Sequence, residues 1–219
     1  MMNTRGAWIA VVCLLVWGAT AQAEPLGVPD IYSSYIRSVY DADTDSWTTT
    51  YGKAQNILFT FGGSTVPISS GTFSITANID DSGIQHGGTL LIGGSITTPA
   101  YSNPLLSGDL VGFGYTPPSD PVNGYPLFEF DFAVSGGSLA SAFGGSAAPV
   151  TVRLSDPSLT GWSGFGSDFQ GTILVGSKGR GQADTFSPIP EPMSACMMLA
   201  SAGMVVLSGC RRRLRGGKR

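Results

Sequence analysis

The stretch Phe128-Glu129-Phe130-Asp131-Phe132-Ala133-Val134 alternates large apolar side chains with acidic or small ones. Successive side chains of a β-strand point to opposite faces, so this order places three phenylalanines and a valine on one face. Both carboxylates then lie on the other face, where water can solvate them. The stretch therefore predicts a half-buried strand of an antiparallel sheet.

The same alternation recurs along the chain, and helical periodicity is almost absent between residues 24 and 187. Further candidate strands are 35–40, 47–51, 57–61, 73–79, 90–97, 110–115, 150–154 and 172–175. Turn signals rich in Gly, Asp, Asn and Pro separate these runs. The pattern predicts an all-β domain, built either as an antiparallel sandwich or as a barrel.

Charge is divided unevenly along the 219 residues, whose formal net charge is −3. All 15 acidic residues lie between Glu24 and Glu191, where only five basic residues accompany them. Six Lys and Arg residues follow in 211–219. An acidic body of this kind does not neutralise phosphates, so we expect no nucleic-acid binding.

The three cysteines, Cys13, Cys196 and Cys210, all lie near the chain ends. The body between them has no cysteine, so we expect it to fold around its core without disulfides. No cysteine nucleophile and no cysteine-based zinc site is possible there.

Residues 1–23 have the layout of a secretory signal peptide. Arg5 supplies the positive start, 7–19 are mostly hydrophobic, and Ala21-Gln22-Ala23 forms an A-x-A cleavage site. We expect signal peptidase to cut after Ala23 during export through the Sec machinery, so that Glu24 begins the mature chain. An uncleaved N-terminal anchor is the alternative.

The C-terminal residues combine three features in a fixed order. Pro190-Glu191-Pro192 is held extended by its prolines, and 193–210 contain 18 residues without charge. As a helix, that stretch would measure about 27 Å, near the lower limit for crossing the core of a bilayer. The basic residues that follow include Arg211, Arg212, Arg213 and Arg215. By the positive-inside rule they stay in the cytoplasm, which places the body on the far side of the membrane.

These three features together resemble the PEP-CTERM sorting tail of exported proteins in Gram-negative bacteria. The resemblance implies that an exosortase, a membrane-embedded processing enzyme, recognises the tail at Pro190, Glu191 and Pro192. Segments 71–80 and 106–115 also look like parts of uncharacterised PEP-CTERM proteins, for which no active site is implied. The alternative for the tail is a permanent single-span anchor.

Two groups of residues are candidates for ligand binding. Asp41, Asp43 and Asp45 alternate as at the start of a Ca²⁺ loop, although Ser46 and Gly52 stand where that loop needs Gly and Glu. The alternative is a solvated hairpin turn, and no other cofactor is expected. Trp47 and Trp162 lie in or near expected loops, with Tyr101, Tyr115 and Tyr125, where they could stack on sugars or pack over the ends of the sheet.

Catalytic candidates are weak. His86 is the single histidine, and no G-x-S-x-G motif accompanies it. Glu129 and Asp131 are spaced as a pair that could hydrolyse glycosides, but the polar face of a strand explains them more simply. We therefore expect a protein without enzymatic activity.

The sequence thus predicts three parts: a signal peptide at 1–23, an exported β-rich domain at 24–186 and a sorting tail at 187–219. The tail comprises the motif at 188–192, a transmembrane helix at 193–210 and a basic cluster at 211–219. The expected function is that of a non-enzymatic protein of the cell surface or extracellular matrix, which is in the inner membrane only in transit. The alternative is a glycan-binding module, with extracellular polysaccharide as its partner.

Overall fold

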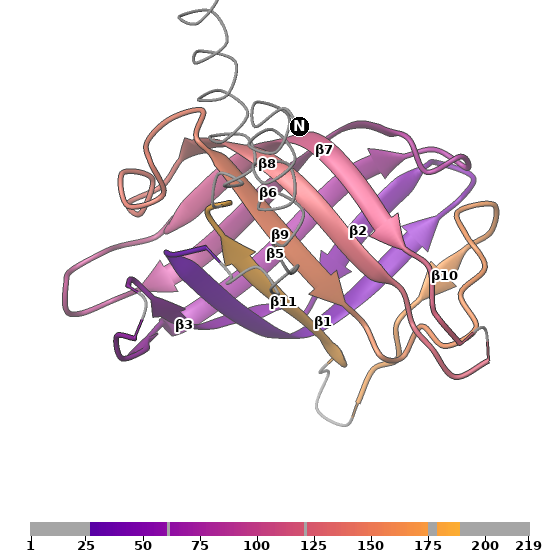
Figure 1. Ribbon diagram of the computed structural model, residues 1–219, viewed down its shortest axis with the longest axis horizontal. Helices are drawn as coiled ribbons and strands as arrows, with labels where there is room; N and C mark the ends of the chain where they lie inside the picture. Colours follow the sequence, from indigo (N-terminus) through magenta and orange to yellow (C-terminus); the bar gives the residue numbers. More distant parts are fainter. Residues whose placement is uncertain (1–26, 61, 121, 175–178, 189–219) are drawn as a thin grey trace, which may run out of the picture.

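The computed structural model describes residues 27–60, 62–120, 122–174 and 179–188. Within these ranges the chain forms strands and no α-helix (Figure 1), which confirms the all-β prediction. The strands are β1 (Asp30–Asp41), β2 (Ser46–Thr50), β3 (Lys53–Leu58), β4 (Val66–Pro67), β5 (Ser69–Ile79), β6 (Gln85–Ser95), β7 (Leu106–Thr116), β8 (Leu127–Gly136), β9 (Pro149–Ser155), β10 (Phe169–Gln170) and β11 (Gly181–Phe186).

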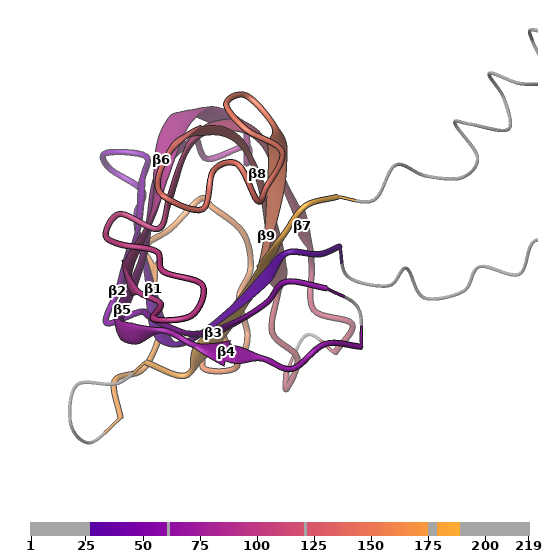
Figure 2. The same cartoon turned by 90° about the vertical axis from the view of Figure 1, so that its left-hand side faces the viewer.

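The strands form one antiparallel sheet that closes on itself. The order β11-β9-β8-β7-β6-β5-β2-β1 returns to its start because β1 also pairs with β11. Of the two expected architectures the structure is therefore the barrel, seen along its length as a flattened ring in Figure 2. An eight-stranded barrel is just wide enough for its interior to be filled by side chains.

Strand β1 closes the barrel. It pairs with two strands along each of its edges. Its first half lies between β3 and β11, and its second half lies between β2 and β10. A bulge at Tyr35, whose φ is +61°, separates the two halves. The bulge shifts the buried positions from Ile31 and Ser33 to Ile36 and Ser38, so both halves face the same interior.

The alternating stretch 128–134 lies within strand β8, and its apolar face fills the barrel. Phe128, Phe130 and Phe132 are each 0% exposed, and Val134 is nearly so. Inward side chains of the neighbouring strand β9, Val152 among them, complete this side of the core. The predicted half-buried strand is confirmed.

Other strand predictions were wrong in part. The strand expected at 57–61 starts earlier and ends at Leu58, and the described residues of the run 172–175 form no strand. Strand β11 was missed. Its sequence, Gly181-Gln182-Ala183-Asp184-Thr185-Phe186, buries small residues at two of its inner positions and so lacks the large apolar alternation of the others.

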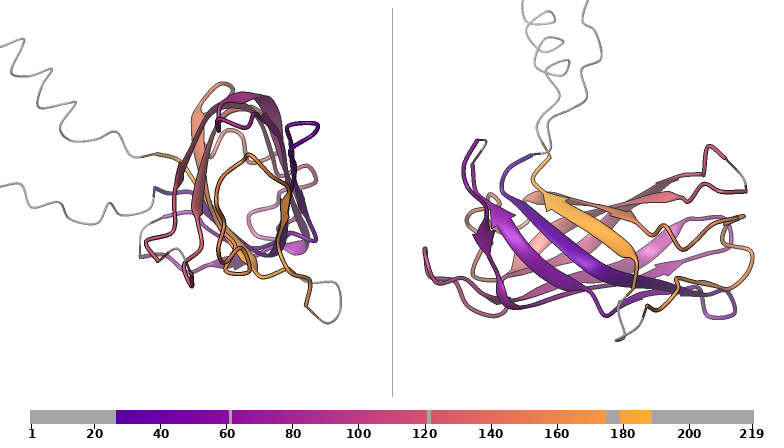
Figure 3. Two further views of the ribbon diagram at one scale, coloured as in Figure 1. Left: turned by 90° about the vertical axis from the view of Figure 1, so that its right-hand side faces the viewer. Right: turned by 90° about the horizontal axis from the view of Figure 1, so that it is seen from below.

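The barrel has two different ends, which Figure 3 shows from below. The first, here called the terminal end, carries Gly27 and Pro188 together with loops 59–65, 96–105 and 137–148. The amide of Ser187 donates to the carbonyl of Pro29 there, at 3.4 Å. The second, here called the mouth end, carries loops 42–45, 80–84, 117–126 and 156–168. Because neighbouring strands are antiparallel, successive loops alternate between the two ends.

The expected signal peptide, sorting motif, transmembrane helix and basic cluster lie outside the described residues. Along the part of the chain that the structure describes, no helix is both long enough and apolar enough to span a bilayer.

Candidate functional site

The segment 156–168 between β9 and β10 covers the mouth end and is anchored by a buried carboxylate. Asp156 is 0% exposed and accepts hydrogen bonds from the amides of Ser38 and Ser158, at 3.3 and 3.1 Å, and from the Ser158 hydroxyl. The Ser158 oxygen in turn accepts from the amide of Thr172, at 2.7 Å. Asp156 therefore fixes the start of the segment to strand β1 and, through Ser158, ties it to the chain that follows β10.

Short strand β10 holds the far side of the segment against β1. Phe169 and Gln170 pair with Tyr40 and Val39. The guanidinium of Arg37 donates to the carbonyl of Gly171, at 2.9 Å, and to the side chain of Gln170. Asp168 accepts from the amide of Ala42, at 2.8 Å, which joins the segment to the β1–β2 hairpin.

Trp162 lies in this segment, as expected from its glycine-rich surroundings, and is half-buried among other rings. Its ring centroid is 5.2 Å from Tyr115, 5.4 Å from Phe165 and 5.5 Å from Phe128, in edge-to-face arrangements. Such pairs stabilise by about 0.5–1.5 kcal/mol beyond the area they bury. The packing therefore holds the indole in one orientation.

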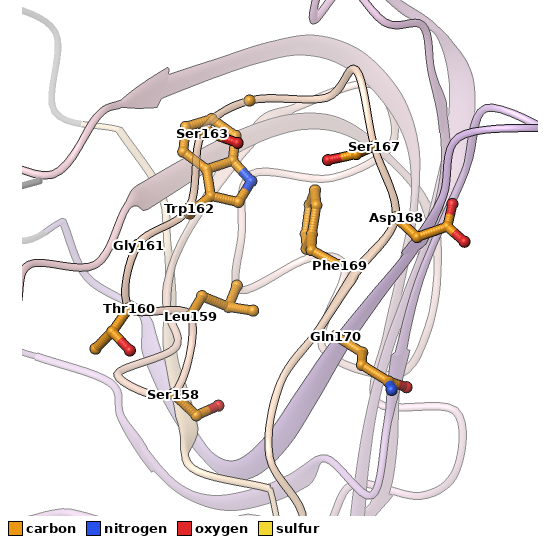
Figure 4. Close-up of a pocket in the computed structure, with 11 residues that line it drawn as sticks. Ser158, Leu159, Thr160, Gly161, Trp162, Ser163, Ser167, Asp168, Phe169 and Gln170 are labelled. Carbon is orange, nitrogen blue, oxygen red and sulfur yellow. The ribbon is translucent and has the colours of Figure 1, made fainter. Parts of the chain in front are cut away.

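A cavity of about 260 Å³ opens inside the segment. Figure 4 shows the rings of Trp162 and Phe169 and the hydroxyl of Ser167 facing its interior, while Asp168 points away. Its lining residues are Ser158, Leu159, Thr160, Gly161, Trp162, Ser163, Gly164, Ser167, Asp168, Phe169 and Gln170. Aromatic rings beside several hydroxyls and one amide suit a small, neutral, hydroxyl-bearing ligand. The lining includes no basic side chain, which disfavours anions.

Trp47 lies close to the 42–45 loop, as expected, but its side chain is buried. It is the second residue of β2 and is 0% exposed, with its ring 4.6 Å from Phe128 inside the barrel. Alternation within β2 explains this, because Ser46 and Thr48 take the outward positions. A ring enclosed by the core cannot stack on a sugar at the surface.

The acidic triplet Asp41, Asp43 and Asp45 forms the expected hairpin turn. One carboxylate oxygen of Asp41 accepts from the amides of Asp43 and Thr44, at 3.0 and 3.2 Å. Asp45 has a φ of +55°, and its carbonyl accepts from the amide of Ile79. Among the described residues, no three His, Cys, Asp or Glu side chains gather in a way that could hold a metal. The calcium loop is therefore not formed, because Asp41 caps the turn instead.

His86 lies in strand β6 and contacts a neighbouring turn. Its Nε2 atom is 3.0 Å from the carboxylate of Asp80, which also accepts from the amides of Ser82 and Ile84. The hydrogen bond with His86 is the main reason why the pKa of Asp80 is lowered, followed by the bond from Ile84. Asp80 thus organises the 80–84 turn, as expected for an aspartate at that position.

Glu129 and Asp131 lie on the outer face of β8 and are each engaged by strand β9. Arg153 donates to Glu129 at 2.8 Å, and the hydroxyl of Thr151 donates to Asp131 at 2.7 Å. The Arg153 guanidinium also lies over the ring of Phe186, 5.2 Å from its centroid. These contacts account for both carboxylates as part of the polar outer face.

No family model, curated protein or solved structure matches this chain. No relative therefore indicates what the mouth-end cavity binds, and its chemistry is read from its own lining residues. Sequence reasoning identified Trp162 but missed Asp156, Asp168 and Phe169. The pair Asp156-Pro157 is a common turn signal and could have indicated an organised turn. Nothing local marks Phe169, whose role depends on pairing with the distant Tyr40.

Proposed function

We propose that the chain is a non-enzymatic protein of the cell surface or extracellular matrix, delivered through a PEP-CTERM-like tail. Signal peptidase cuts after Ala23 during Sec export. Residues 193–210 then hold the chain in the inner membrane, with Arg211 and the basic residues after it in the cytoplasm. An exosortase recognises Pro190-Glu191-Pro192 and processes the tail.

The position of the last strand is the observation that carries this proposal. Strand β11 ends at Phe186 and completes the barrel, whereas the motif begins at Pro190. Processing at the motif would remove no residue of any strand. The β domain would therefore keep its fold after losing the tail, as a sorted product must.

Two further features support delivery outside the cell. The part of the chain between the signal and the tail has no cysteine, so its folding does not depend on the redox state of the compartment. Closure also pairs the outer strands of the sheet, and unpaired strand edges are a common route to aggregation. A crowded matrix favours such a domain, in which only the two-residue strands β4 and β10 remain as edges among the described residues.

Intact mass spectra of the protein from its native host test the proposal, taken separately from membrane and secreted fractions. The expected species begins at Glu24 and ends near Pro192, with or without an added group. A species that retains Arg219 in both fractions would make the tail a permanent anchor. Recovery from the cytoplasm with both ends intact would overturn export itself.

Glycan binding is a second candidate function, favoured by the cavity at Trp162. Stacking of a sugar on an aromatic ring is worth on the order of 1 kcal/mol, so Trp162→Ala should weaken binding to a matching polysaccharide about fivefold to tenfold. Tyr51→Ala is the control, because Tyr51 is exposed but does not line this cavity. Absence of binding to a broad polysaccharide panel would remove this candidate.

A further inference from the structure

The two ends of the barrel differ sharply in charge. The mouth end carries seven aspartates that reach the surface to different extents: Asp41, Asp43, Asp45, Asp80, Asp81, Asp120 and Asp168. The terminal-end loops 59–65, 96–105 and 137–148 contain no Asp, Glu, Lys or Arg at all. A hollow of about 320 Å³ beside that end is likewise lined only by uncharged residues, among them Ser69 and Asn103. The loops are thus acidic at one end of the barrel and uncharged at the other, here called the neutral end, where Asp30 at the start of β1 is the nearest carboxylate among the described residues.

The chain enters and leaves the barrel at the neutral end. Asp30 at the start of β1 pairs with Phe186 at the end of β11, and Gly27 lies against Ser187, so the two ends of the described chain are neighbours. Only residues 187–192 separate β11 from the uncharged stretch that begins at Met193. Six residues, even fully extended, span at most about 20 Å. A tail held in a membrane therefore keeps this end close to the bilayer.

Electrostatics favours the same orientation. A membrane surface with anionic lipids repels aspartates that come within a Debye length, about 8 Å at physiological salt. Strands of 11 residues, such as β5 and β7, separate the two ends by about 30 Å when tilted as in a barrel. With the neutral end toward the lipid, the aspartates stay beyond the reach of this repulsion.

We infer that the tethered protein holds its neutral terminal end against the bilayer and points its acidic mouth end, with the Trp162 cavity, away from the membrane. The inference rests on the proposed membrane-spanning role of residues 193–210. The kind of partner for the terminal end is an anionic lipid surface. The mouth end is left open toward the aqueous phase, away from the membrane that holds the tail.

Site-specific fluorescence quenching tests this orientation in the full chain, inserted in vesicles that contain phosphatidylglycerol. Cys13, Cys196 and Cys210 are first changed to serine. A polarity-sensitive label is then attached either at Thr97→Cys on the terminal end or at Ser119→Cys on the mouth end. Both residues are exposed. Nitroxide-bearing lipid headgroups should quench the first label at least about threefold more than the second, because the ends differ in distance by about 30 Å.

Extraction of the same vesicles with alkaline carbonate separates two kinds of failure. If the protein stays in the membrane and both labels are quenched equally, or the Ser119→Cys label more, the orientation is wrong while the spanning tail stands. If carbonate releases the protein, the spanning tail fails and the orientation fails with it. A pair of labels at Ser141→Cys and Thr160→Cys should repeat the contrast, which guards against an effect of one substitution.

Discussion

The rings of Trp47 and Phe128 meet edge-to-face inside the barrel, with their centroids 4.6 Å apart and their planes at 68°. Phe128 in turn lies 5.5 Å from Trp162 in the cavity wall. The core and the mouth-end cavity are thus one continuous aromatic cluster. A substitution that disrupts the core should therefore also disturb the cavity wall, although the two are far apart in the sequence.

Replacing Trp47 should destabilise the domain strongly. Trp47→Ala leaves a large void beside Phe128, and such changes typically lower the free energy of unfolding by about 3–5 kcal/mol. Urea unfolding followed by circular dichroism measures this. Tyr51→Ala, at an exposed position, should change the same quantity by less than about 1 kcal/mol. Equal effects of the two substitutions would contradict the buried position of Trp47.

Asp156 should control the order of the cavity segment. Asp156→Ala leaves the amides of Ser38 and Ser158 without their acceptor, and each lost bond of this kind costs about 1–3 kcal/mol. Hydrogen exchange of residues 158–168 should therefore accelerate by tenfold or more. Asp168→Ala is the matched control, because that carboxylate is exposed and accepts a single amide. Unchanged protection in the Asp156 variant would refute the anchoring role.

Asp30 should make the domain less stable as the pH rises. Burial, and then the charge of Asp184 on β11, raise the pKa of Asp30 from 3.8 to about 6. The folded state therefore holds this proton more tightly than the unfolded state does. The stabilisation of the folded state by this proton is fully present below about pH 3.8 and is lost as the pH rises through about 6. Burial is also the main cause that raises the pKa of Asp184, which Arg153 partly opposes.

Comparison with Asp30→Asn isolates this effect from other titrations. The variant should match the wild type near pH 3.5 and exceed its stability at pH 7. A shift of about two pKa units corresponds to less than 3 kcal/mol, and partial exposure of the side chain reduces this to about 1 kcal/mol. Urea midpoints at several pH values give the difference. A constant difference across the range would show that Asp30 does not titrate as described.

Truncation of the chain after β11 should leave the domain stable, whereas truncation before β11 should disrupt it. A protein ending at Pro188 keeps every strand and should unfold at the same urea concentration as a protein ending at Pro192. A protein ending at Arg180 lacks β11 and exposes the edges of β1 and β9, so it should aggregate or lose its sheet signal. Circular dichroism and gel filtration distinguish these outcomes. Equal behaviour would mean that closure by β11 contributes nothing.

Sequence alternation predicted the strands whose inner faces carry large apolar side chains. Phe128, Phe130 and Phe132 on β8 are the clearest example, and Ile75 and Ile79 on β5 are another. The choice between barrel and sandwich could not be made in this way. That choice depends on β11, where Gly181 and Ala183 fill inner positions with almost no hydrophobic signal.

The cavity was only partly predictable for a related reason. Trp162 stood out because glycines follow it closely, and Gly164 indeed adopts a φ of +123° that favours glycine. Asp156 binds Ser38, which lies 118 positions away along the chain. Local patterns carry no information about such a contact. The burial of Trp47 likewise depended on the register of β2 against β1.

Because the first long strand pairs with the last one, the barrel can close only late in folding. Synthesis proceeds from the N-terminus, so β1 is present long before β11, its pairing partner, has been made. Contacts between distant parts of a chain form late and slowly. The ring therefore cannot close until nearly all of the body is available, and on the proposed export route this means after the body has crossed the membrane. Completion of the fold thus depends on the arrival of the final strand.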